Sequence, residues 1–136
     1  MRWRRWDLCA CYNRATRSLR QISTRSGSGL KLTAAEPLAR HVYHLFVVRV
    51  RKRDSVRAEL ATRGIQAGVH YPTPCHWQPP LRQFAERPLP VAEQSAGELL
   101  SLPMFPHMTE DQIDYVCESL RDALRAAPVG SEIVNV

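Results

Sequence analysis

The stretch VYHLFVVRVRKRDSVRAELATRGIQAGVHYP, residues 42–72, decides the fold of this chain. Its first part, residues 42–50, is rich in β-branched and aromatic side chains, which are typical of strands. Successive side chains of a strand point to opposite faces. One face would carry His44, Phe46, Val48 and Val50, and the other Tyr43, Leu45, Val47 and Arg49. The segment therefore predicts a central strand of a sheet.

A short helix is predicted after this strand. Asp54 is a candidate cap for its first turn, and Gly64 provides the left-handed backbone that ends many helices. Glu59 and Arg63 have the spacing of an i,i+4 ion pair. The apolar face consists of Val56 and Leu60. Residues 65–69, IQAGV, then predict a second strand that leads into a proline-rich loop.

Another helix is predicted to begin at Pro90, because proline is tolerated in the first turn of a helix. An apolar stripe extends this prediction through residue 100. The stripe consists of Val91, Ala92, Ala96, Leu99 and Leu100. The following SLPMFPHM, residues 101–108, contains two prolines and is expected to run extended.

The last helix has the clearest start signal. Thr109 and Gln112 have the spacing of a capping box, and acidic residues in the first turn with basic residues near the end suit the helix dipole. The predicted core face consists of Ile113, Val116, Cys117, Leu120 and Leu124. Residues 127–136 are expected to form a flexible tail.

The positive charge of the chain is concentrated at its start. Residues 1–25 hold seven arginines and one aspartate, whereas the basic and acidic residues of the remainder balance. Apolar residues at helical spacing predict a helix from about Trp3 to Arg20. Such a basic segment can bind nucleic acid or an anionic membrane, but no RNA-binding signature or recognition-helix motif accompanies it. We therefore expect neither a membrane nor nucleic acid as the main partner.

The length of 136 residues suits one domain. The longest apolar stretches are far shorter than the roughly 20 residues needed to span a bilayer. The cysteines, Cys9, Cys11, Cys75 and Cys117, form no C-x-x-C pair, so neither a zinc knuckle nor a disulfide framework is indicated. These features favour a reducing, cytoplasmic setting.

The loop GVHYPTPCHWQPP, residues 68–80, combines ring-bearing side chains with a backbone stiffened by four prolines. Residues that precede proline are biased away from helix, so we expect an extended segment in which the side chains of His70 and Tyr71 diverge. His70, Cys75 and His76 lack an acidic fourth partner for zinc. Cys75 and His76 are adjacent and would point apart, which disfavours a thiol–imidazole pair.

A plainer interpretation remains open for this loop. Its two histidines and its tyrosine can be packing groups whose polar atoms are satisfied by the backbone. The chain also has only two lysines, Lys31 and Lys52. Lys31 lacks the spacing of a phosphate-binding loop and is expected to be a solvated loop residue. Lys52 lies in a charged turn and would need burial to become a good amine nucleophile. Neither is well placed for Schiff-base chemistry.

Several motifs together resemble one enzyme family. They are YHLF at the start of the strand, RGIQAGVHYPTPCHWQ for the second strand and loop, PVAE before the third helix, and SLPMFPHMT before the last. This pattern is similar to the C-terminal part of DegT/DnrJ-type sugar-nucleotide aminotransferases, which use pyridoxal 5'-phosphate (PLP). The resemblance runs from about Arg4 to Leu124 and is weakest over residues 21–40.

The resemblance implies a two-layer α/β fold, the small domain of the aspartate-aminotransferase-like fold. A mostly antiparallel sheet of three or four strands would carry helices on one side, preceded by a long N-terminal helix. Residues 1–25 would form a basic linker helix to a large domain that is absent from the chain. Residues 26–126 would be the small C-terminal domain, and 127–136 the tail.

In that family the large domain carries PLP and its Schiff-base lysine, so the resemblance implies that this chain has no catalytic residue and binds no PLP alone. It also implies that the HYP loop contacts a nucleotide-sugar substrate. His70 and Tyr71 match substrate-contacting positions, and His76 and Gln78 match the motif with a less defined role. The expected partners are a large aminotransferase domain or a second subunit.

Two hypotheses of function follow. The first is the C-terminal fragment of an aminotransferase that aminates keto-sugar nucleotides in amino-sugar biosynthesis and is inactive alone. On this hypothesis Met1 precedes the interior of a longer helix, which favours truncation, and the isolated chain is expected to be marginally stable or to self-associate. The second is a non-catalytic domain that binds nucleic acid or a protein through the basic N-terminal helix.

Overall fold

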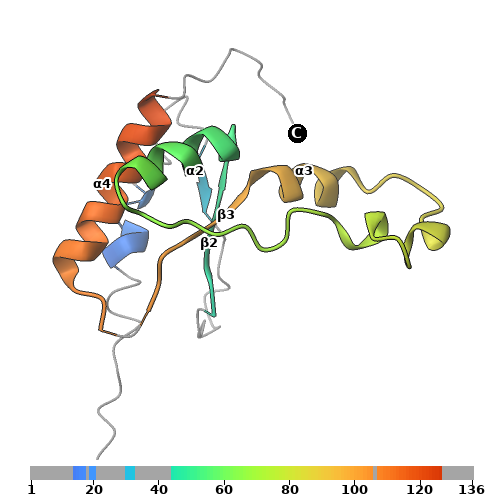
Figure 1. The fold of residues 1–136 in the computed structure, drawn as a ribbon, viewed down its shortest axis with the longest axis horizontal. Coiled ribbons are helices and arrows are strands. Elements are labelled where there is room, and N and C mark those ends of the chain that lie inside the picture. The colour runs from blue at the N-terminus through green and yellow to red at the C-terminus, as the bar shows by residue number, and fades with distance from the viewer. Residues whose placement is uncertain (1–13, 18, 21–29, 33–43, 106, 127–136) are drawn as a thin grey trace, which may run out of the picture.

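The computed structural model describes residues 14–17, 19–20, 30–32, 44–105 and 107–126. Its main elements are β1 (Leu30–Leu32), β2 (Phe46–Val50), α2 (Arg53–Thr62), α3 (Pro90–Glu98), β3 (Leu99–Leu102) and α4 (Glu110–Ala126), as Figure 1 shows. Two short 3₁₀ turns, η1 (Cys75–Trp77) and η2 (Arg82–Phe84), lie between α2 and α3. Of the predicted N-terminal helix, residues 14–17 and 19–20 are helical, and the rest lies outside the described residues together with the predicted tail.

The sheet has three strands in the order β1-β2-β3, and both pairs are antiparallel. The fold is therefore the expected small α/β arrangement. The central strand was predicted correctly, although its extended part begins at Phe46. The edge strand β1 was missed, and Lys31, expected in a loop, lies on it opposite Arg49. Three residues are too few for a periodic pattern, and it is pairing with β2 that makes this segment a strand.

The core lies on one face of the sheet, between the strands and helices α2 and α4. Alternate residues of β2, at positions 46, 48 and 50, which were predicted to share one face, are buried. Val56 and Leu60 of α2 are completely buried against them. The remaining large core side chains are Leu19, Leu30, Ile65, Leu100, Leu102, Ile113, Val116 and Leu120. Figure 1 shows α2 and α4 side by side next to the strands.

The helix α2 begins one residue earlier than its predicted cap. Lys52 occupies the N-cap position with a left-handed φ of 51°, and no side chain caps the helix. Asp54 instead lies in the first turn and accepts a hydrogen bond from Arg53 at 3.0 Å, so the prediction that Asp54 caps the helix was wrong. The predicted end of the helix is confirmed, since Gly64 has a φ of 74°.

The segment predicted as a second strand, residues 65–69, makes only one bridge to the sheet, between Gly68 and Ser101. The third helix is also shorter than predicted. It ends at Glu98, and Leu99 and Leu100, which were assigned to its apolar stripe, begin β3. Leu100 pairs with Val48 of β2. A strand at this place buries the leucine side chain as fully as a helix would, and pairing with β2 also provides hydrogen-bond partners for the backbone N–H and C=O groups.

The last helix, α4, begins as predicted. The backbone N–H of Thr109 donates to Gln112 Oε1 at 2.9 Å, and the N–H of Gln112 donates to Thr109 Oγ1 at 3.2 Å, which is a complete capping box. Its predicted core face is confirmed, with Leu124 only partly buried. Arg14 of the N-terminal helix donates to Asp114 at 3.0 Å, which attaches that helix to α4.

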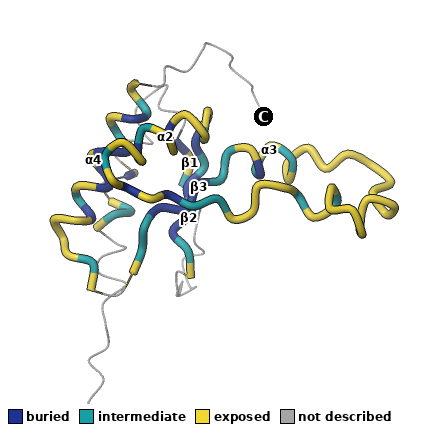
Figure 2. Tube along the Cα trace, viewed as in Figure 1, coloured by how far each residue is buried: buried dark blue, intermediate teal, exposed yellow. Residues whose placement is uncertain are grey.

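Residues 70–95, here called the arm, extend away from this core (Figure 1). The chain runs outward through η1 and η2 and returns along α3. Figure 2 shows that nearly the whole arm is exposed, in contrast to the buried sheet. Among the described residues, no helix combines the length and the apolar character that a membrane span requires.

Candidate functional site

The base of the arm is joined to the sheet through Gly68, His70 and Ser101. Gly68 and Ser101 exchange two backbone hydrogen bonds, with N···O distances of 2.9 and 2.8 Å. His70 Nδ1 lies 3.0 Å from the hydroxyl oxygen of Ser101. Ser101 is only 5% exposed, whereas His70 is exposed. A buried serine therefore holds one ring nitrogen of a histidine that is exposed as a whole residue.

Tyr71 is the most exposed of the large hydrophobic residues of the arm, at 78%. Its hydroxyl makes no hydrogen bond within the described residues. Its ring meets the His70 ring edge-on, with centroids 6.1 Å apart. The expectation that these two side chains diverge was wrong, because the backbone bends at His70 and does not continue as a strand. The two rings lie next to each other on an open surface.

His76 is placed differently. Its Nε2 lies 3.0 Å from Glu93 Oε1, and its side chain is only 13% exposed. The same carboxylate oxygen accepts the backbone N–H of Leu89 at 3.0 Å. The Leu89 N–H, and then His76, hold the pKa of Glu93 below its ordinary value. His76 therefore connects the outgoing part of the arm to the start of α3.

Gln78 ends the first 3₁₀ turn. Its backbone N–H donates to Cys75 O at 3.0 Å, and its carbonyl accepts from the N–H groups of Leu81 and Arg82 at 2.9 and 3.0 Å. Its side chain is exposed and has no hydrogen bond among the described residues. Of the four predicted substrate-binding residues, the structure brings together His70 and Tyr71. It places His76 and Gln78 further along the arm, in other surroundings.

The cysteines present no reactive pair in the described part of the chain. Cys75 is exposed and its thiol makes no hydrogen bond there, while the neighbouring His76 is hydrogen-bonded to Glu93. Cys117 is 2% exposed, and burial, assisted by the nearby Asp114 charge, raises the pKa of its thiol to about 11. No three His, Cys, Asp or Glu side chains gather as metal ligands in the described ranges.

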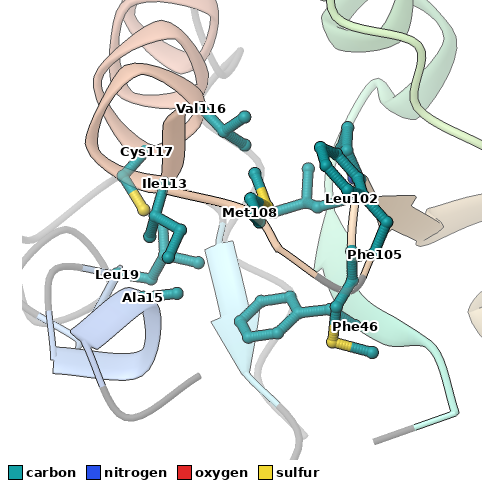
Figure 3. A pocket seen from close by; sticks show the side chains of 11 residues that line it. Ala15, Leu19, Phe46, Leu102, Phe105, Met108, Ile113, Val116 and Cys117 are labelled. Atoms are coloured by element: carbon teal, nitrogen blue, oxygen red, sulfur yellow. The ribbon is translucent and has the colours of Figure 1, made fainter. Parts of the chain in front are cut away.

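An apolar hollow lies beside the core, between the N-terminal helix and α4 on one side and β2 and β3 on the other (Figure 3). Phe46, Phe105 and Met108 line one part of it, and Leu19 and Cys117 line the opposite part. The lining is apolar throughout. Because a sugar nucleotide requires hydrogen-bond donors at its phosphates and sugar, this hollow is not its site.

Sequence reasoning missed two contributors to the arm. Ser101 was placed in a segment expected to run extended and Glu93 was noted only within the PVAE motif, yet each binds a histidine of the loop. In the sequence, these two residues stood out only as members of the motifs PVAE and SLP, which do not indicate the side chains that Glu93 and Ser101 contact. Both contacts join residues 17 to 31 positions apart, so local spacing could not reveal them.

Comparison with known proteins defines the relationship. A sequence profile of the DegT/DnrJ/EryC1/StrS aminotransferase family matches residues 1–121. The erythromycin biosynthesis sensory transduction protein EryC1 of Saccharopolyspora erythraea is 38% identical over 103 residues, which are 74% of this chain and 28% of that protein. The dTDP-3-amino-3,4,6-trideoxy-alpha-D-glucose transaminase of Streptomyces venezuelae is 42% identical over 98 residues, 71% of this chain and 25% of that protein. This chain thus spans about a quarter of the length of these curated relatives.

Solved structures agree. DesV of S. venezuelae superposes with a TM-score of 0.73 and 33% identity, covering 90% of this chain and 33% of DesV. NtdA of Bacillus subtilis, solved with the cofactor PMP, superposes with a TM-score of 0.73 and 26% identity, covering 85% of this chain and 27% of NtdA. The fold is that of the PLP aminotransferases, the aspartate-aminotransferase-like fold. The chain belongs to the DegT/DnrJ/EryC1/StrS aminotransferase family.

Proposed function

We propose that this chain is the substrate-binding small domain of a PLP-dependent aminotransferase that acts on keto-sugar nucleotides. Several relatives are named as transaminases of nucleotide-linked sugars. The observation that carries the proposal is the pair His70 and Tyr71, two hydrogen-bonding rings side by side at the exposed base of a proline-stiffened arm. Donors on a stiff segment lose little conformational entropy when a ligand binds.

The chain's own lysines do not fit PLP. The cofactor requires a lysine beside its aldehyde carbon and an acidic partner at its pyridine nitrogen. Lys31 and Lys52 are the only lysines of the sequence, and both are exposed, one on the edge strand β1 and the other at the start of α2. We therefore assign the cofactor-binding lysine to polypeptide outside this sequence.

The residues of the arm would bind and orient the substrate. The Tyr71 hydroxyl both donates and accepts, so it suits a sugar hydroxyl, while the free Nε2 of His70 reaches a neighbouring oxygen. Gln78 would offer its amide to a more distant part of the ligand. His76 would act indirectly in this proposal, since its Nε2 faces Glu93 and holds the loop against α3.

On the same proposal, the exposed apolar side chains of the arm would contact another polypeptide. Phe84 and Val91 are 71% and 73% exposed, and exposed apolar side chains concentrated on one projecting segment are typical of interaction surfaces. We assign this surface to the large aminotransferase domain or to a second subunit. In the alternative function, basic N-terminal residues would bind nucleic acid, but Arg14 already pairs with Asp114 and Glu110 of α4.

A chimera tests the proposal. The aligned C-terminal part of the S. venezuelae transaminase is replaced by residues 1–126 of this chain. We expect the chimera to aminate a dTDP-linked keto-sugar, whereas the 136-residue chain alone treated with PLP and borohydride should show no stoichiometric labelling of Lys31 or Lys52. An inactive but folded chimera, or specific labelling of either lysine, would contradict the proposal.

A further inference from the structure

We infer that Ser101 and Gly68 are positioning residues that fix the His70 ring, so that its Nε2–H points outward as a donor for an oxygen of the nucleotide-sugar. The substrate part of this inference rests on the proposed function. The ring geometry does not, because it follows from contacts within the chain. Neither residue would touch the substrate itself.

The strand register explains why a serine lies beneath His70. Ser101 pairs with Val47 of β2, and the neighbouring pairs, Phe46 with Leu102 and Val48 with Leu100, place their side chains in the core. Because side chains alternate along a strand, Ser101 faces the opposite side of the sheet. It is nevertheless 5% exposed there. The Gly68 bridge continues the sheet at the free edge of β3, and from the residues that follow it the His70 ring reaches the Ser101 hydroxyl.

The hydrogen bond between Ser101 and His70 determines the tautomer of neutral His70. The Ser101 hydroxyl is buried, and its one hydrogen-bond partner within the described residues is His70 Nδ1, at 3.0 Å. A buried hydroxyl hydrogen without an acceptor is costly. Donation from Ser101 Oγ–H to Nδ1 removes that cost, and it leaves the ring proton on Nε2.

Gly68 provides the space for this ring position. A Cβ atom added at Gly68 would lie 2.7 Å from Cε1 and 3.3 Å from Nδ1 of His70. The distance of 2.7 Å to Cε1 is much shorter than van der Waals contact, so the His70 ring would have to move away. The backbone φ of Gly68 is not positive, and alanine is therefore compatible with the chain conformation. The conflict is with the ring alone.

Nε2 of His70 has no hydrogen bond within the described residues, and His70 as a whole is exposed. It lies next to Tyr71, whose hydroxyl is also free. An N–H donor beside a hydroxyl matches the acceptor oxygens of a diphosphate or a sugar hydroxyl. Fixing the ring in advance reduces the entropy lost when the ligand binds.

The ring position is tested by NMR on the full 136-residue chain, above the pH range in which histidine titrates. For the wild type we expect one tautomer at His70, with Nε2 protonated and Nδ1 unprotonated, and a strong NOE between His70 Hε1 and the Gly68 Hα protons. An averaged tautomer pattern, a proton on Nδ1, or a missing NOE in the wild type would overturn the inference.

Two variants each remove one of the contacts that hold the His70 ring. Ser101→Ala deletes the hydroxyl, and Gly68→Ala fills the ring's place; both should abolish the NOE, while the backbone amides of residues 68 and 101 keep their protection. Ser101→Thr, which retains a hydroxyl, should keep the NOE. The matched control is Ser119→Ala, since Ser119 is also buried, at 2% exposed, but lies on α4. If Ser101→Ala leaves the NOE and tautomer unchanged, the inference is wrong.

The same variants in the chimera separate this inference from the proposed function. Ser101→Ala should raise KM for the nucleotide-sugar by about five- to tenfold, the effect of losing one hydrogen bond to an ordered ring, and Ser119→Ala should not. If the NMR results hold but His70→Ala leaves KM unchanged, the positioning of the ring stands and the substrate role of His70 fails.

Discussion

Phe84 provides a sharp test of the arm as an interaction surface. Its side chain is 71% exposed at the outer part of the arm, in η2. A phenylalanine presents roughly 200 Å² of surface, so about 140 Å² remain uncovered. At about 25 cal/mol per Å², covering all of it would contribute about 3.5 kcal/mol. A partner that covers half would gain about 1.7 kcal/mol, or about 20-fold in affinity.

We therefore expect Phe84→Ser to weaken self-association of the chain by about 20-fold for each Phe84 that is covered, as measured by sedimentation equilibrium. The free energy of unfolding should change by less than about 0.5 kcal/mol, because the side chain makes few contacts in the monomer. Urea unfolding at a protein concentration that favours the monomer measures this second quantity.

Leu120→Ala is the opposite control. Leu120 is fully buried in α4, so its truncation should cost about 2–5 kcal/mol of unfolding free energy and leave the arm unchanged. The reasoning is refuted if Phe84→Ser destabilises the monomer as much as Leu120→Ala does. It is also refuted if the chain self-associates and Phe84→Ser leaves the association constant unchanged.

Three further predictions concern single groups. The N–H of Leu89 and the ring of His76 lower the pKa of Glu93. The ionised carboxylate therefore stabilises the fold above the usual titration range of glutamate, and this stabilisation is lost on acidification. Between about pH 5 and about pH 3, the wild type should lose more thermal stability than Glu93→Gln, as followed by circular dichroism. Cys117, with a thiol pKa of about 11, should resist iodoacetamide at pH 8 in the native chain and react in urea, as mass spectrometry would show. Gly64→Ala should cost about 1 kcal/mol in urea unfolding, because its φ of 74° disfavours a side chain.

Interactions between residues near each other in sequence were predictable. The capping box of Thr109 and Gln112 and the pair of Glu59 and Arg63, at 3.0 Å, were both expected from spacing and are both present. These interactions span three or four residues, so the local backbone alone brings the groups together. The left-handed residue at Gly64 belongs to the same class.

Interactions between distant segments were not predictable in this way. Leu99 and Leu100 fit a helical stripe, and only the neighbouring strand β2 makes them a strand. The same holds for Ser101, whose role depends on a bridge to Gly68 that no spacing rule describes. The family resemblance predicted the fold and the importance of the HYP loop, but it gave no indication that Ser101 and Glu93 hold its two histidines.

The central claim is that this chain binds the nucleotide-sugar while another polypeptide supplies the reactive lysine. The most direct measurement is the KM of the chimera for its dTDP-linked keto-sugar, with Tyr71→Phe and His70→Ala introduced separately. We predict that each raises KM by about five- to tenfold, with turnover at saturating substrate changed much less. An unchanged KM in both variants would contradict the claim.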